Sequence, residues 1–125
     1  MPHLVMEHSS NVDVPGDVHH VLRQLHSVLN DVGGILITNC KSRVYQADSF
    51  LIADGQSDEG FVHLDISFVR GRSDDVKAQI SRDCLSVLKD AFLPINKQPL
   101  QITVNVDDIA LEMYSKHPAG TLTLQ

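Results

Sequence analysis

The chain has 125 residues, of which 42% are hydrophobic and 21% are charged. These proportions are typical of an ordinary soluble globular protein, and the length predicts one domain over residues 1–125. The formal net charge of −6 argues against binding to nucleic acid, because a phosphate backbone needs a basic face. Apolar runs are too short to span a membrane and no secretory signal opens the chain, so we expect a cytoplasmic protein without membrane contact.

The first half of the chain predicts a strand, a helix and further extended segments. Residues 2–8 are apolar-rich and predict a strand that begins at the start of the chain. Apolar residues then recur at helical spacing up to Gly33-Gly34, with Asp13 as the expected N-cap and Pro15 in the first turn. Two segments compatible with extended chain and one turn-like loop follow, at residues 35–37, 43–45 and 53–60.

The second half repeats this order. Apolar and polar residues alternate over residues 61–69, which predicts a strand with one buried face. Residues 70–72 predict a turn, and Ser73 followed by two aspartates is a good N-cap for a helix that ends at Pro94. Residues 100–106 alternate again and predict the last strand.

The chain therefore contains two successive strand–helix–strand units. Such units are right-handed and place both of their strands in one sheet, with the helices on one face. We predict an α/β (α+β) fold in which a four-stranded mixed sheet carries both helices on one face. The other face is expected to be open, and covering it calls for a partner subunit. Residues 107–125 lack strong periodicity and are a candidate arm to that partner.

Cysteine and histidine residues give no sign of a metal or cofactor site. The two cysteines, Cys40 and Cys84, form neither a disulfide framework nor a paired CxxC motif. Cys84 lies in an apolar helical stripe and is expected to be a buried structural thiol. The seven histidines lack HExxH or HxH spacing, and no GxGxxG or phosphate-binding loop occurs. We therefore predict no metal site and no cofactor.

Basic residues are unevenly distributed. Four of the ten Lys and Arg residues flank the middle segment, namely Lys41, Arg43, Arg70 and Arg72. A small electropositive site on an acidic protein favours a small anion over a polyanion. Spacing alone is equally compatible with solvated loop residues. Arg72 also directly precedes the helix predicted to begin at Ser73, and a helix N-terminus attracts anions as a guanidinium does.

Pro2 is a candidate catalytic residue because a small second residue normally permits removal of Met1. Proline then carries a free secondary amine. An α-amino group titrates near about 7.7–8.0, and burial lowers its pKa further by disfavouring the charged form. A base with a pKa near neutrality suits proton abstraction beside a carbonyl group. A Met-Pro start is weak evidence by itself, and the position of Pro2 at the opening of a strand strengthens it.

Five runs of residues carry a family resemblance. They are Pro2-His3-Leu4-Val5-Met6-Glu7, Ser42-Arg43-Val44, Ala53-Asp54-Gly55-Gln56, Phe61-Val62-His63 and Gly71-Arg72-Ser73. Together these runs resemble the 5-carboxymethyl-2-hydroxymuconate isomerases of the tautomerase superfamily. The resemblance spans nearly the whole chain, although the second helix and the last strand match in pattern more than in identity.

The resemblance implies a homotrimer whose sheets face inward and an isomerase that needs no cofactor, in aromatic-compound (homoprotocatechuate) catabolism. Pro2 is implied as the general base that moves a proton within the di- or tricarboxylate 5-carboxymethyl-2-hydroxymuconate, converting it to its 2-oxo isomer. Arg72 matches a family arginine expected to bind a substrate carboxylate. Lys41 stands where arginine is expected, which keeps the charge but loses the bidentate fork, and Arg43 is a candidate substitute.

Two other functions stay open on the sequence. The first is a tautomerase of a different unsaturated oxo-acid, with Lys41 marking the change of substrate. The second is a non-catalytic trimeric binding module, because a fold alone does not determine function.

Overall fold

A computed structural model describes residues 2–118, and Met1 and residues 119–125 lie outside the described residues. The main elements in chain order are β1 (His3–Ser9), α1 (Val18–Gly33), β2 (Lys41–Ala47), β3 (Gly60–Val69), α2 (Asp74–Phe92) and β4 (Leu100–Ile109). Short 3-10 helices occur at η1 (Ile37–Asn39), η2 (Leu93–Ile95) and η3 (Leu111–Met113).

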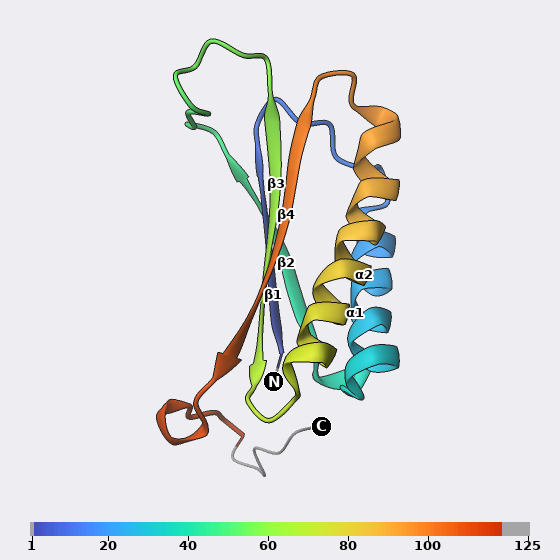
Figure 1. Cartoon of the computed structure of the whole chain (residues 1–125), viewed down its shortest axis with the longest axis vertical. Helices are drawn as coiled ribbons and strands as arrows, with labels where there is room; N and C mark the ends of the chain where they lie inside the picture. The colour runs from blue at the N-terminus through green and yellow to red at the C-terminus, as the bar shows by residue number, and fades with distance from the viewer. Residues whose placement is uncertain (1, 119–125) are drawn as a thin grey trace.

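The four strands form one mixed sheet in the order β2-β1-β3-β4. Each strand–helix–strand unit pairs its own two strands in parallel, and the units join through the antiparallel pair β1 and β3. Both helices cover the same face of the sheet, as Figure 1 shows. The predicted four-stranded mixed sheet with two helices on one face is confirmed.

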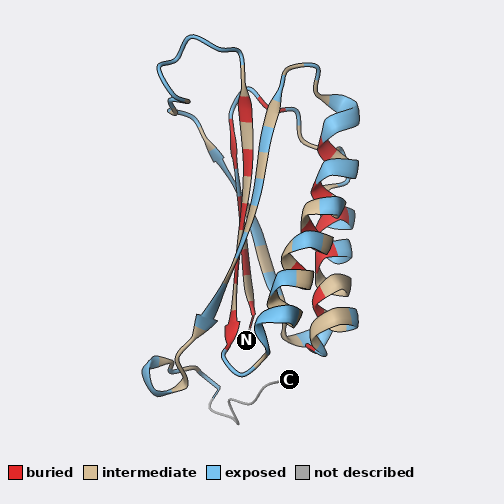
Figure 2. Cartoon of the chain, in the orientation of Figure 1, coloured by how far each residue is buried: buried red, intermediate tan, exposed pale blue. Residues whose placement is uncertain are grey.

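The core lies between the sheet and the helices. The alternation predicted for residues 61–69 places every second side chain of β3 against the helices, where Val62, Leu64 and Ile66 are fully buried. Figure 2 shows the buried residues along the central strands and on the inner sides of the helices. Cys84 is fully buried there, as predicted, and desolvation raises the pKa of its thiol to about 12. The thiol therefore stays protonated and acts as a small apolar side chain.

The other face of the sheet is open in the single chain. Strand register and alternation place mostly polar side chains on it, among them Glu7, His63, Asp65, Thr103, Asn105 and Asp107. A large exposed apolar patch would by itself indicate a binding partner, but this surface is mostly polar. A partner on this face would make polar contacts.

Two predicted boundaries are wrong, the start of α1 and the end of the last strand. The N-cap of α1 is Asp17, whose carboxylate accepts a hydrogen bond from the His20 amide at 3.1 Å, so Pro15 lies before the helix. Asp13 instead donates its amide to Asn96 Oδ1 at 2.7 Å. Residues 35–37, whose sequence is compatible with extended chain, lie outside the sheet: the Ile35 amide bonds to the Leu29 carbonyl, Leu36 is extended, and η1 begins at Ile37. The last strand continues past residue 106 to Ile109.

Candidate active site

Pro2 is buried at the entrance to β1. Alternate residues of a strand share a face of the sheet. Leu4 and Met6 face the helices, so the ring of Pro2, two residues before Leu4, belongs to the same helix-covered side. Its carbonyl accepts a hydrogen bond from the Lys41 amide at 3.1 Å, which continues the parallel pairing of β1 with β2 by one step. The start of β1, the end of β3 and the start of α2 meet at this end of the sheet, near the label N in Figure 1.

Arg72 lies at the same end, in the turn between β3 and α2. Gly71, with φ of +133°, supplies a backbone conformation that other residues rarely adopt. The Arg72 Nε atom donates to the Gly33 carbonyl at the C-terminus of α1, at 2.7 Å. Its guanidinium carbon lies 5.2 Å from the centre of the Phe68 ring, a cation–π contact. Burial lowers the pKa of Arg72, but a guanidinium stays charged in proteins.

Arg72 and Pro2 share one side of the sheet. His3 pairs with Ser67 across the β1–β3 ladder, so the next step places Pro2 beside Phe68, the ring that Arg72 covers. A half-buried cation and a buried N-terminal residue therefore lie near each other under the helices, at the end of the sheet where α1 ends and α2 begins. Such a site is suited to an anionic ligand.

Arg43 and Lys41 lie on the opposite side of the sheet. Arg43 Nη1 donates to His3 Nδ1 at 3.2 Å. The exposed Lys41 side chain turns back to the Asn39 carbonyl, at 3.3 Å. The three basic residues predicted as substrate ligands are thus at the same end as Pro2, but they are divided between two faces. Arg70, the fourth basic residue of the segment, forms an exposed ion pair with Glu112 at 2.7 Å.

Sequence reasoning missed the partners of these residues. Phe68 and Gly33 position Arg72, and Tyr114 contacts His3 Nε2 at 3.2 Å. The alternation of residues 61–69 predicts that Phe68 is buried, but it does not predict that a cation lies above the Phe68 ring. Tyr114 lies in a segment without periodicity, so no local pattern indicates its position. The site's direct signals are its basic residues and the Met-Pro start.

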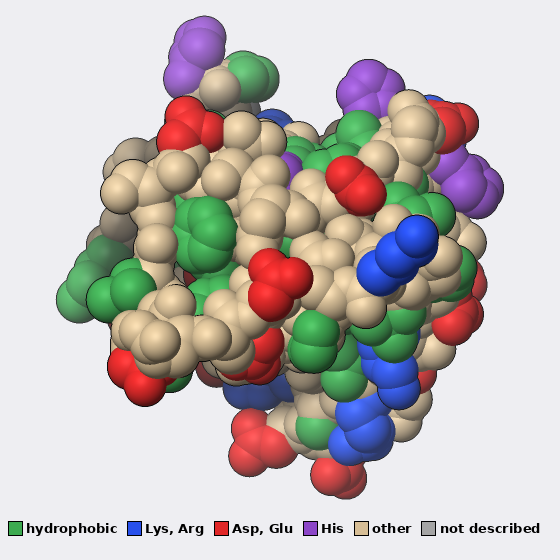
Figure 3. All heavy atoms as spheres, turned by 90° about the horizontal axis from the view of Figure 1, so that it is seen from above, with side chains coloured by type: hydrophobic (Ala, Val, Ile, Leu, Met, Phe, Trp, Pro, Cys, Tyr) green, Lys and Arg blue, Asp and Glu red, His purple; other side chains and the backbone are tan. Residues whose placement is uncertain are grey.

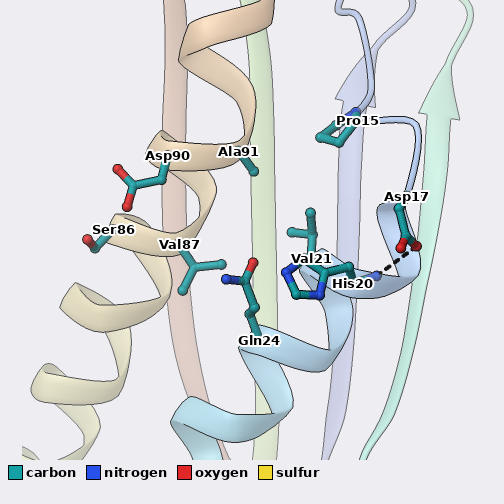
Figure 4. Close-up of a pocket in the computed structure, with 9 residues that line it drawn as sticks. All are labelled: Pro15, Asp17, His20, Val21, Gln24, Ser86, Val87, Asp90 and Ala91. Atoms are coloured by element: carbon teal, nitrogen blue, oxygen red, sulfur yellow. Dashed lines mark hydrogen bonds between the residues drawn. The ribbon is translucent and has the colours of Figure 1, made fainter.

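A groove of about 420 Å³ lies elsewhere, between the start of α1 and the end of α2. Figure 4 shows Gln24 of α1 and Val87 of α2 pointing toward each other across it, while the Asp17 carboxylate caps α1. This groove is formed by the helix surfaces and is far from Pro2 along both helices. Figure 3 views the end of the molecule away from Pro2, where acidic side chains are scattered and basic ones lie mostly along one side. None of the predicted site residues lines the groove between the two helices.

No group of three His, Cys, Asp or Glu side chains within residues 2–118 is arranged to hold a metal ion. Within the same residues, none of the helices is both long enough and apolar enough to cross a membrane.

The sequence profile of the 5-carboxymethyl-2-hydroxymuconate isomerase family matches residues 2–120. The chain belongs to this family. It is therefore an isomerase, and the resemblance seen in its sequence is confirmed.

Individual relatives of the isomerase family agree with this assignment. The 5-carboxymethyl-2-hydroxymuconate Delta-isomerase of Escherichia coli is 27% identical over 100 residues, which are 80% of this chain and 79% of the relative. The crystal structure of a 5-carboxymethyl-2-hydroxymuconate isomerase from Deinococcus radiodurans R1 superposes with a TM-score of 0.81 at 24% identity, covering 98% of this chain and 90% of that one.

The same fold occurs in a more distant solved structure. A fused 4-OT wild-type symmetric trimer superposes with a TM-score of 0.73 at 11% identity, covering 96% of this chain and 95% of that one. At this identity the likeness shows the fold alone. It confirms the predicted tautomerase-like arrangement of sheet and helices.

Proposed function

We propose that this isomerase moves a proton within an unsaturated 2-hydroxy/2-oxo carboxylic acid, with the amine of Pro2 as the general base. The observation that carries the proposal is the burial of Pro2 at the end of a sheet where Arg72 and Arg43 approach from its two faces. Burial disfavours the charged form of an amine, and the nearby guanidinium groups act in the same direction. A neutral secondary amine is the form that accepts a proton.

The proton transfer balances within the substrate. The neutral Pro2 amine takes the proton of the dienol hydroxyl, and the oxygen's electron pair forms the new C=O bond. The double bonds shift along the chain, and the carbon at their far end takes the proton from the prolinium. No electrons are gained or lost overall, so the step needs no oxidant or reductant. The amine exists only on molecules that have lost Met1, which lies outside the described residues.

We propose 5-carboxymethyl-2-hydroxymuconate as the substrate. The name of the Escherichia coli relative supports it, and so does the division of Arg72 and Arg43 between two faces at the Pro2 end, which suits an acid with separated carboxylates. We also propose a homotrimer, as in the fused 4-OT symmetric trimer, with the open faces of the sheets turned inward.

A second candidate is a tautomerase of a different oxo-acid. The observation that favours it is the Lys41 side chain, which bonds to the Asn39 carbonyl and has no planar fork with which to bind a carboxylate. A substrate without the carboxymethyl group has one carboxylate fewer, so it needs one basic residue fewer to bind it. The two candidates share the role of Pro2 and differ in the substrate.

One experiment tests both candidates. Protein whose free Pro2 amine has been verified by mass spectrometry is assayed with 5-carboxymethyl-2-hydroxymuconate and with 2-hydroxymuconate, by the loss of dienol absorbance. The matched control is the same chain with an uncleaved N-terminal extension, which converts the amine into an amide. Activity in the free form alone supports the proposal, and the preferred substrate decides between the candidates. Equal activity in both forms excludes Pro2 as the base, and inactivity of both forms excludes these two acids as substrates.

A further inference from the structure

Three side chains from distant parts of the chain meet on the open face beside Pro2. His3 of β1 contacts Arg43 of β2 through its Nδ1 atom, which lies 3.2 Å from Arg43 Nη1. His3 Nε2 lies 3.2 Å from the hydroxyl oxygen of Tyr114, which follows η3. The His3 and Tyr114 rings are edge to face, with centroids 6.5 Å apart and planes at 66°. We call this group the His3 cluster.

The donors and acceptors of the cluster fix the form of the imidazole. A guanidinium has only donors, so His3 Nδ1 must be the acceptor in its contact with Arg43. A neutral imidazole then carries its single proton on Nε2, and this N–H donates to the Tyr114 oxygen. Burial lowers the pKa of His3, and the charges of Arg43 and Lys41 lower it further, which agrees with the neutral form. If His3 Nδ1 carried a proton, its N–H and the guanidinium N–H of Arg43 would face each other as two donors, and no hydrogen bond could form between them.

The cluster has a consequence for Arg43. Its side chain is exposed, and an exposed arginine samples many directions unless a partner holds it. The contact with His3 uses one of the guanidinium's nitrogens and restricts the directions that the group samples. Tyr114 fixes His3 in turn, so the segment after β4 helps to set the direction of a cation on β2.

We propose that His3, held by Tyr114, is a positioning residue that orients the Arg43 guanidinium to bind the carboxylate of a dicarboxylate ligand remote from the reacting carbon. This inference rests on the proposed function, because it assumes that the ligand's reacting end lies at Pro2. It assigns part of the selectivity for two carboxylates over one to the open face, and it gives Tyr114 an indirect role in ligand binding.

The test compares two six-carbon dienes that differ in one carboxylate. trans,trans-Muconate has a carboxylate at each end, and sorbate has one. Their dissociation constants are measured by calorimetry for the wild type and for two substitutions of equal polarity. His3→Asn keeps an acceptor near the position of Nδ1, whereas His3→Gln keeps a polar group near Nε2 and loses that acceptor. His63→Gln, on the same face but bonded to Thr103 and Asp65, is the control.

We expect His3→Gln to weaken muconate binding about tenfold and sorbate binding less than twofold, since charge-assisted hydrogen bonds are the strong ones. His3→Asn should stay within about threefold of the wild type, and Tyr114→Phe should fall between the two. Nitrogen-15 spectra of the imidazole should show Nδ1 without a proton. Equal weakening of both ligands, unchanged muconate binding in His3→Gln, no muconate binding by the wild type, or a proton on Nδ1 would each overturn the inference.

Binding is measured without turnover, so the result is separate from the proposed function. A chain that binds muconate as expected but isomerises neither dienol keeps the His3 cluster and loses the role of Pro2. A chain that isomerises a dienol with the same KM in His3→Gln keeps Pro2 and loses the His3 cluster. Should His3→Gln fail to fold, Tyr114→Phe decides by the same muconate-to-sorbate ratio.

Discussion

The two ends of the sheet are built from equivalent parts but carry different side chains. The two strand–helix–strand units are related across the antiparallel β1–β3 pair, so each end holds the start of one unit and the turn of the other. The Pro2 end carries cations and a chain terminus. The opposite end is closed by amide and hydroxyl groups, with Asn96 bonded to the Asp13 backbone, Gln98 to the Asn11 carbonyl, and the Phe61 amide to Ser9.

The proposed base, the amine of Pro2, has no counterpart at the opposite end, because β3 is preceded by a connection that continues the chain. The connection instead provides backbone groups that close its end, such as the Glu59 carbonyl that accepts from Asn11. We therefore expect substitutions at the Pro2 end to change activity more than stability, and substitutions at the opposite end to do the reverse.

The largest expected effect is that of Pro2→Ala. Loss of the secondary amine should lower kcat for the dienol-to-oxo conversion about 100-fold or more, which is the contribution of a positioned general base. The free energy of unfolding should change by no more than about 1 kcal/mol, because a single ring at the chain start is removed. Steady-state kinetics and urea unfolding measure the two effects. A decrease in kcat of less than threefold would rule out Pro2 as the base.

Asn96→Ala should show the opposite behaviour. The Asn96 side chain accepts from the Asp13 amide at 2.7 Å and donates to the Asp13 and Phe92 carbonyls at 3.0 and 2.8 Å. Loss of three such bonds at a half-buried position should cost about 2 kcal/mol of unfolding free energy. Gln98→Ala, which removes one exposed bond, is the matched control and should cost about 0.5 kcal/mol. A large loss of kcat in Asn96→Ala would contradict the division between the two ends.

Most of the fold could be predicted because its signals are local. Alternation over residues 61–69 reports one buried face of a strand, and the Ser73 cap bonds to an amide three residues away. The start of α1 was predicted wrongly because its competitor is remote. Asp13 resembles an N-cap, but its amide bonds to Asn96, 83 residues along the chain, and Asp17 caps the helix instead.

The candidate site could be predicted only in part, because its contacts also join residues that are remote in the sequence. Pro2, Arg72, Arg43 and Lys41 are visible as chemical types in the sequence, and the fold brings all four to one end. Their distribution between two faces depends on strand parity, which becomes visible only once the register is known. The contact of His3 with Tyr114 spans 111 residues and leaves no periodic trace.

Arg72→Ala tests a residue that we expect to contribute both to substrate binding and to stability. Loss of a carboxylate ligand should raise KM for a dicarboxylate dienol about tenfold and leave a monocarboxylate analogue nearly unchanged. Loss of the bond to the Gly33 carbonyl and of the contact with Phe68 should also cost about 1 kcal/mol of unfolding free energy. Arg70→Ala, which breaks an exposed ion pair, is the control for charge and should change both quantities little. An equal rise in KM for both substrates would exclude a carboxylate clamp.

The smallest expected effect concerns pH and His26, which lies between the two ends. His26 Nε2 is 2.8 Å from Ser42 Oγ, and desolvation lowers the pKa of His26 below its usual 6.5. Above pH 6.5 the imidazole is neutral in both states, and this contribution to stability is fully present. As pH falls below 6.5 the unfolded chain takes up the proton first, so stability decreases until the folded-state pKa is passed. His26→Gln should therefore lose less stability than the wild type when urea unfolding is measured between pH 7.5 and 5.5. The control is His20→Gln, at an exposed position of the same helix, which should follow the wild type. Identical pH slopes for wild type and His26→Gln would show that His26 does not contribute to this dependence.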